Sequence, residues 1–97
     1  MPESEQQYPM PGNQCLQHCC KLACVHDHPI LLDYWTASQD KKVVIGVRDS
    51  GEKLLVKSED EYTSPIGKIY RVDNEYIIIS ENSIYITSDK ILTKRIS

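Results

Sequence analysis

The residues of this chain that are best suited to chemistry are its cysteines and histidines, which all lie between residues 15 and 28. Cys20 and Cys24 are one helical turn apart, and His26 and His28 follow them closely. Cysteine thiolate and neutral imidazole are ligands that zinc prefers, and a structural zinc ion would stabilise a chain with a small core. These four residues are therefore the candidate zinc ligands, and a small zinc-stapled binding module is one hypothesis for the function.

The spacing of these donors favours a different interpretation. Structural zinc sites usually take their ligand pairs from separated segments, whereas these donors share one predicted turn and its exit. Free cysteine also behaves as a small apolar side chain that is commonly buried. We therefore expect the cysteines to fill a helix–sheet contact, the histidines to be solvated, and the protein to use no cofactor.

Catalytic chemistry has little support in the remaining sequence. A Cys/His nucleophile would require His18 to activate Cys19 or Cys15, but no orienting acid or oxyanion donor accompanies these residues. The four glycines are scattered and form no phosphate-binding pattern. We therefore expect no catalytic residues and predict that the protein is not an enzyme.

Length and charge exclude further classes of protein. A chain of 97 residues is the size of one domain, and it contains no apolar run near the roughly 20 residues that a membrane span requires. The net charge of −3 opposes binding to nucleic acid. We expect no secretory signal, because residues 1–14 show no basic segment followed by an apolar one, and the cysteines lie at helical spacing that suits disulfides poorly. These features predict an intracellular, reducing location with free thiols.

The elements that position these residues fall into three stretches. Residues 1–13 contain three prolines and are predicted to form a flexible arm. Residues 14–97 are predicted to form one compact domain, in which residues 14–25 form a short helix capped by Asn13. The predicted apolar stripe of this helix consists of Leu16, Cys19, Cys20, Ala23 and Cys24.

The rest of the domain is predicted to be mainly β. A first strand is expected at Ile30–Thr36, within an antiparallel meander over residues 30–88 that closes toward a small barrel or sandwich. Residues 89–97 are expected to form a final short strand or an adhesive tail. Ser58 precedes an acidic run and Ser64 precedes a proline, so both serines are candidate phosphorylation sites, although a solvated loop explains the acidic run more simply.

The turn at residues 49–51 leaves two strand registers open. A two-residue loop would pair Val47 with Leu54 and would set Arg48 opposite Lys53. A three-residue loop would instead pair Arg48 with Glu52, which brings opposite charges together. Gly51 supplies the left-handed conformation that hairpin loops require in either register, and we favour the three-residue loop.

Two-residue turns at residues 73–74 and 81–82 fix a second set of pairings by counting. They place Tyr70 opposite Ile77 and Ile77 opposite Ile86. The resulting core face consists of Tyr70, Val72, Ile77, Ile79, Ile84 and Ile86. The opposite face is also apolar, so the Cys-rich helix, the curl of a small barrel or another chain must cover it. Together with the aromatic anchor Trp35, this face supplies the predicted partner-binding residues: Trp35, Ile69, Tyr76, Ile78 and Tyr85.

Four segments of this chain resemble a group of viral proteins. They are Pro29–Trp35, Ile45–Arg48, Gly51–Ile66 and Glu75–Ile86, within residues 29–88. They are similar to small uncharacterised β-rich proteins encoded by large DNA viruses of algae and protists. The resemblance implies a component of a virion or virus factory, located in the virion or host cytoplasm, and it assigns no functional residues.

The sequence as a whole predicts a non-catalytic structural or protein-interaction module. Its expected partner is another protein or a second copy of the same chain. No nucleic acid and no membrane span are expected. The zinc-stapled binding module that uses the Cys/His segment 15–28 is the alternative.

Overall fold

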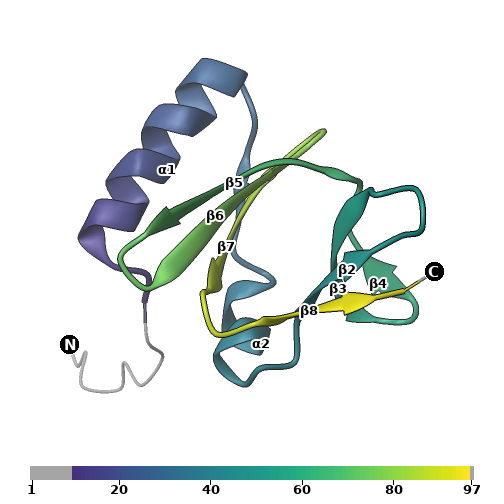
Figure 1. Ribbon diagram of the computed structural model, residues 1–97. Coiled ribbons are helices and arrows are strands. Elements are labelled where there is room, and N and C mark those ends of the chain that lie inside the picture. Colours follow the sequence, from purple (N-terminus) through teal and green to yellow (C-terminus); the bar gives the residue numbers. More distant parts are fainter. Residues whose placement is uncertain (1–9, 97) are drawn as a thin grey trace.

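A computed structural model describes residues 10–96 and shows two separate β-sheets with one long helix, α1 (Figure 1). Sheet I has the strand order β1 (Ile30–Leu31), β7 (Ile84–Ser88), β6 (Glu75–Ser80), β5 (Ile66–Val72). Sheet II has the order β4 (Glu61–Tyr62), β3 (Lys53–Ser58), β2 (Val44–Val47), β8 (Leu92–Arg95). The mainly β composition with one main helix is thus confirmed. The predicted arm lies mostly at residues 1–9, outside the described residues.

Both sheets are mixed, so the prediction of a purely antiparallel meander was wrong in two places. Strand β1 runs parallel to β7, with Ile30 opposite Ile84. Strand β8 runs parallel to β2, with Leu92 opposite Val44. The other neighbouring strands are antiparallel. The final segment therefore forms the expected short strand, and it completes sheet II beside a strand from the first half of the chain.

Helix α1 spans Asn13–His26 and begins one residue earlier than predicted. Asn13 is its first residue rather than its cap. The cap position belongs to Gly12, which provides no side-chain hydrogen bond. Instead, the backbone N–H of Gly12 donates to Oε1 of Glu75 at 3.4 Å, and its carbonyl accepts from Leu16 at 3.0 Å. A tertiary contact thus fixes the start of the helix in place of a local cap.

The buried face of α1 agrees with the predicted stripe only in part. Leu16, Cys19 and Ala23 pack on the core between α1 and sheet I, as predicted. Cys15 and Cys19 are fully buried, whereas Cys20 and Cys24 are exposed. The sheet-facing side also includes Leu22, which lies three residues after Cys19. Because leucine buries more apolar area than cysteine, docking Leu22 rotates the helix and directs Cys20 and Cys24 to solvent.

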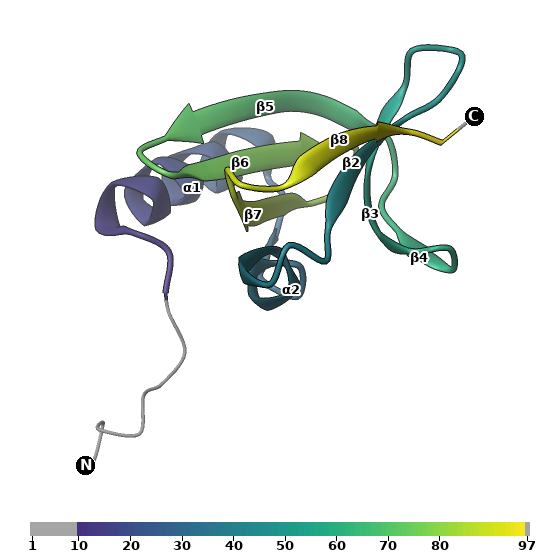
Figure 2. The ribbon, with the colours of Figure 1, turned by 60° about the horizontal axis from the view of Figure 1, so that its bottom comes forward.

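Only Ile30–Leu31 of the predicted strand Ile30–Thr36 is extended, as β1; a turn follows, and a second helix, α2 (Trp35–Gln39), takes up the end of the predicted strand. It lies beside β7 (Figures 1 and 2). The fully buried Ser38 explains this position, because its Oγ donates to the carbonyl of Trp35 at 2.6 Å and accepts from the N–H of Ser88 at 2.9 Å. One hydroxyl thus closes the helical turn and attaches α2 to sheet I.

Sheet I carries a core on each of its faces. The helix-side core lies between α1 and sheet I, and its fully or nearly fully buried members are Cys15, Cys19, Trp35, Ile77, Ile79, Ile84 and Ile86. The inter-sheet core lies between sheets I and II, and its buried members are Tyr34, Val43, Ile45, Leu55, Ile78 and Ile91. The two cores confirm the predicted core face of sheet I and show that its opposite face is covered by the chain's own second sheet.

The strand registers agree with those obtained by counting. Tyr70 lies opposite Ile77, and Ile77 lies opposite Ile86. At the other hairpin, the N–H of Arg48 donates to the carbonyl of Glu52 at 2.8 Å, so the three-residue loop is the correct alternative. Gly51 in this loop has a φ of 96°, which glycine adopts without strain.

Candidate interaction surface

The predicted partner-binding residues lie in the two cores rather than on a free surface. Trp35 is only 6% exposed in the helix-side core, and Ile78 is fully buried in the inter-sheet core. Ile69, Tyr76 and Tyr85 are half-buried and pack against the inter-sheet core. A role for these five residues in binding stays a prediction.

Tyr34 is the residue that joins the two sheets at this core. Its ring meets the Tyr85 ring edge-on at a centroid distance of 5.2 Å, and Nζ of Lys57 lies 4.8 Å from its centroid. Burial raises the pKa of Tyr34 to about 12, with smaller contributions from Tyr85 and nearby carboxylates. The phenol is therefore neutral at pH 7, and its ring packs between the two sheets as an apolar group.

The candidate zinc ligands do not converge on one point. Cys20 and Cys24 are exposed on α1, and His26 and His28 lie at its end with ring centroids 5.8 Å apart. Within residues 10–96, no group of three or more His, Cys, Asp or Glu side chains could hold a metal ion. Zinc binding stays a prediction that rests on donor type.

The two buried thiols are poor candidates for nucleophiles. Burial raises the pKa of Cys15 to about 12, and the charge of Glu75 adds to this effect. Burial likewise raises the pKa of Cys19 to about 11, with a smaller contribution from Cys20. Because the thiolate is the reactive form, both groups are inert at neutral pH. Their role is to pack α1 against sheet I.

A row of apolar side chains crosses the outer face of sheet II, which is the face turned away from sheet I. Alternate residues of a strand point to opposite faces, so Val44 and Val56 point outward while Ile45 points into the inter-sheet core. Strand pairing places Leu92, Val44, Val56 and Tyr62 side by side across all four strands. Leu92 is 63% exposed and Tyr62 is 54% exposed. Sheet II is therefore apolar on both faces.

This row borders a groove of about 620 Å³ on the outer face. Its lining consists of Arg48, Leu54, Val56, Ser58, Glu59, Tyr62 and Ile96. Arg48 stands at the β2–β3 loop and Glu59 follows the far end of β3, so the two charges mark opposite ends. A Cβ at Gly46 would lie 2.7 Å from Cδ1 of Ile96 and 3.0 Å from Cγ2 of Val56. Glycine here lets Ile96 lie flat on the sheet.

The sequence contained the signal for this surface. Consecutive apolar residues run into β2 (Val43–Ile45) and lie within β3 (Leu54–Val56), and such runs occur where a strand is apolar on both faces. The same signal in β6 led to the predicted adhesive face. The sequence alone did not reveal that one face of sheet II covers sheet I. It also did not reveal that the other face of sheet II is left uncovered.

The fold thus defines a small domain of two mixed four-stranded sheets with one principal helix and an apolar face on sheet II. No family model matches the chain, and no curated protein and no solved structure shows significant similarity to it. Neither helix found in residues 10–96 has the length and apolar character needed to cross a membrane.

Proposed function

We propose that this protein is a non-catalytic interaction module that self-associates through the outer face of sheet II. The carrying observation is the apolar row that runs across all four strands, because its two end residues, Leu92 and Tyr62, are largely exposed. Contiguous exposed apolar patches of this kind mark interaction sites. Burying the row against an apolar partner would remove this surface from water.

The charges at the ends of the groove favour a second copy as the partner. Arg48 and Glu59 lie at opposite ends of the groove. A two-fold axis through the middle of the groove would place Arg48 of each copy near Glu59 of the other. Symmetric homodimers use one self-complementary surface in this way. The groove therefore supplies both the apolar centre and the charged rim of an isologous interface.

The edge of sheet II favours contact through its face. Strand β8 forms one edge, and all four of its residues are exposed. Lys94 places a positive charge on it, next to Arg95, which pairs with Asp49 at 3.3 Å, and a charged edge opposes edge-to-edge pairing with a second copy. Face-to-face packing of two copies of sheet II avoids this repulsion at the edge.

The non-catalytic part of the proposal is supported by the state of the two candidate nucleophiles beside His18. Cys15 and Cys19 are buried and protonated at neutral pH, as their raised pKa values require. A place in a viral assembly is supported only by the resemblance of residues 29–88, and a zinc-stapled module is supported only by the donor types in residues 15–28.

Sedimentation velocity over a range of protein concentrations tests self-association. The wild-type chain is expected to dimerise, and Tyr62→Asp is expected to be monomeric because it places a charge in the apolar row. Leu32→Asp is the matched control, since Leu32 is an exposed apolar residue outside the row. A wild-type chain that stays monomeric at about 1 mM would overturn the proposal, because the dimer would then be too weak to matter.

Charge reversal tests the two-fold arrangement. Arg48→Glu and Glu59→Arg are each expected to weaken the dimer, because each sets like charges opposite one another. Arg48 also pairs with Glu52 in its own chain at 3.5 Å, but this pair is exposed and contributes little to stability. The double variant is expected to recover dimerisation relative to both single variants. Additive losses in the double variant would contradict the two-fold geometry.

A further inference from the structure

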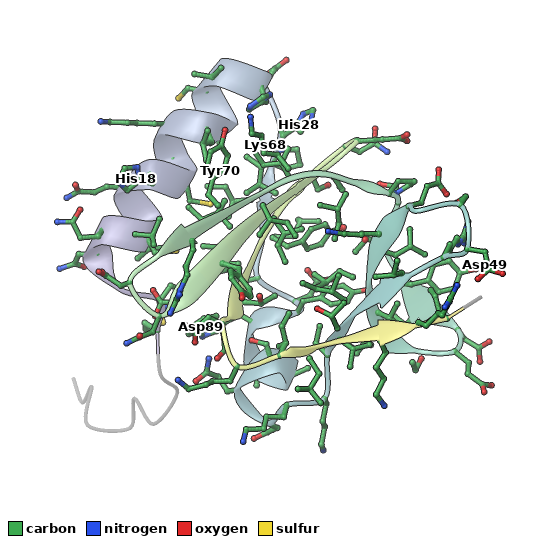
Figure 3. The ribbon with its side chains drawn as sticks, viewed as in Figure 1. His18, His28, Asp49, Lys68, Tyr70 and Asp89 are labelled. Atoms are coloured by element: carbon green, nitrogen blue, oxygen red, sulfur yellow. The ribbon has the colours of Figure 1, made fainter. Side chains whose placement is uncertain are left out.

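A second groove lies between α1 and β5, on sheet I. Its volume is about 390 Å³, and its lining consists of His18, Lys21, Leu22, Tyr70, Arg71, Val72 and Ile77. Leu22, Val72 and Ile77 form an apolar floor that is continuous with the helix-side core. Figure 3 shows Tyr70 and Lys68 projecting from β5 on the side of α1. The groove is thus walled by the helix on one side and by a strand on the other.

Strand β5 forms the edge of sheet I. Within residues 10–96 it pairs with β6 on one side and with no strand on the other. In an antiparallel pair, alternate residues direct their backbone N–H and C=O groups away from the partner strand. The seven residues of β5 include no proline, so these groups can accept a further strand. An open edge beside an apolar groove is the arrangement in which proteins bind extended peptides by adding a strand.

Basic side chains line this groove. Among the described residues that line it, the charged side chains are all basic, although the chain carries a net charge of −3. Nζ of Lys68 adds a further positive charge 5.7 Å from the centroid of the Tyr70 ring. The guanidinium of Arg71 bonds to Asp89 at 2.9 Å. Lys21 and Lys68, one from each wall, therefore supply most of the charge for a ligand.

From these observations we infer that the groove between α1 and β5 binds an extended acidic peptide that pairs with β5 as an additional strand. Alternate side chains of such a peptide point to one face, so its apolar residues enter the floor formed by Leu22 and Val72. Its acidic residues then lie near Lys21 and Lys68. This inference is independent of self-association, because the groove lies on sheet I and the apolar row lies on sheet II.

Fluorescence anisotropy with labelled eight-residue peptides tests the inference on the full chain. The probes are an alternating Glu-Val peptide, the same peptide N-methylated at alternate residues, an alternating Lys-Val peptide, and an eight-nucleotide oligothymidine. The Glu-Val peptide is expected to bind at least about tenfold more tightly than each of the others, a factor that corresponds to about 1.4 kcal/mol. N-methylation removes the backbone donors that strand pairing requires.

Charge-reversal variants locate the binding site. Lys21→Glu combined with Lys68→Glu is expected to weaken binding of the Glu-Val peptide by at least about tenfold. Lys42→Glu combined with Lys53→Glu is the matched control, because it changes the net charge equally at exposed lysines outside the groove. NMR amide shifts on adding the Glu-Val peptide are expected to be largest in β5.

Several results would overturn the inference. One is tighter binding of oligothymidine than of the Glu-Val peptide. Another is binding of the Lys-Val peptide or of the N-methylated peptide with the same affinity as the Glu-Val peptide. An equal loss of affinity in both lysine double variants, or no binding of the Glu-Val peptide at about 1 mM, would also contradict it. Tighter binding of oligothymidine would indicate a nucleic-acid site. Equal binding of the Lys-Val peptide would exclude recognition by charge, and equal binding of the N-methylated peptide would exclude strand pairing. The dimerisation assay remains a separate readout throughout.

Discussion

Replacing Ile78 by alanine distinguishes a core residue from a partner-binding one. Ile78 is fully buried in the inter-sheet core, where it packs with Val43, Ile45 and Leu55. Removing a buried isoleucine side chain to the β-carbon costs about 2–5 kcal/mol, because apolar contacts are lost and a cavity remains. A domain of this size has a total stability of about 5–15 kcal/mol. We therefore expect the variant to lose a large part of its free energy of unfolding.

Urea unfolding followed by tryptophan fluorescence measures this loss directly. Trp35 is the only tryptophan and is 6% exposed, so its emission reports global unfolding. A loss of about 3 kcal/mol corresponds to a decrease in Tm of roughly 12–24 °C. The conservative change Ile78→Val is expected to cost about 0.5–1.5 kcal/mol.

The control for this experiment is an apolar side chain that the fold leaves exposed. Leu32 is 41% exposed, and Leu32→Ala is expected to cost less than about 1 kcal/mol. If Ile78→Ala were no more costly than Leu32→Ala, sheet II would not cover sheet I in solution. Such a result would refute the two-core architecture and would restore the face of Ile78 as a candidate binding surface.

Three further predictions concern buried polar groups and thiols. Ser38→Ala is expected to lower the urea-unfolding free energy by about 1–3 kcal/mol, because the N–H of Ser88 loses its buried acceptor; a loss below about 0.5 kcal/mol would contradict the role of this hydroxyl. The folded-state pKa of Cys15, about 12, exceeds its ordinary value of 9.0. Above pH 9 the thiol ionises in the unfolded chain but stays protonated in the folded one. The contribution of this thiol to the free energy of unfolding is therefore complete below pH 9 and decreases by about 1.4 kcal/mol per pH unit between pH 9 and 12. Unfolding measured from pH 8 to 10.5 should show a shallower alkaline decline for Cys15→Ala than for the wild type, and identical slopes would argue against burial of the thiol. Ellman's reagent should label the exposed Cys20 and Cys24 in the folded protein and all four cysteines in denaturant; rapid labelling of all four in the folded protein would contradict the packing of α1.

Local signals in the sequence predicted the hairpins well. Turn residues and counting gave the pairing of Tyr70 with Ile77, and charge pairing selected the register of Arg48 with Glu52. These features depend on a few neighbouring residues. Counting from the two turns also identified the core face of sheet I, because a change of one position in register would turn every side chain to the other face.

The errors concern features that distant parts of the chain determine. The segment around Trp35 is apolar enough for a strand, but a hydrogen bond from Ser88 to Ser38 favours a helix there. The parallel pairings of β1 with β7 and of β2 with β8 leave no local turn signal. The face of α1 was only partly predicted. Cys20 and Cys24 were chosen where Cys15 and Leu22 face the sheet, because the four cysteines are chemically alike.

The predicted binding residues illustrate the same limit. Tyr76–Ile79 was correctly identified as apolar on both sides, but the sequence left open whether the cover was the same chain or another. Sheet II supplies that cover. A surface left uncovered can be assigned only after every apolar face has been matched with its partner, and this matching requires the tertiary structure.

The two parallel pairings have a consequence for the order of folding. Hairpins such as β5–β6 and β6–β7 join adjacent segments, and such units form within microseconds. Pairing Ile30 with Ile84 and Val44 with Leu92 must instead close long loops before any contact is gained. Such nonlocal closure slows the search for the native state. Until β8 docks, β2 has an open edge with unpaired backbone groups. Docking of β8 covers this edge and thereby opposes intermolecular β aggregation.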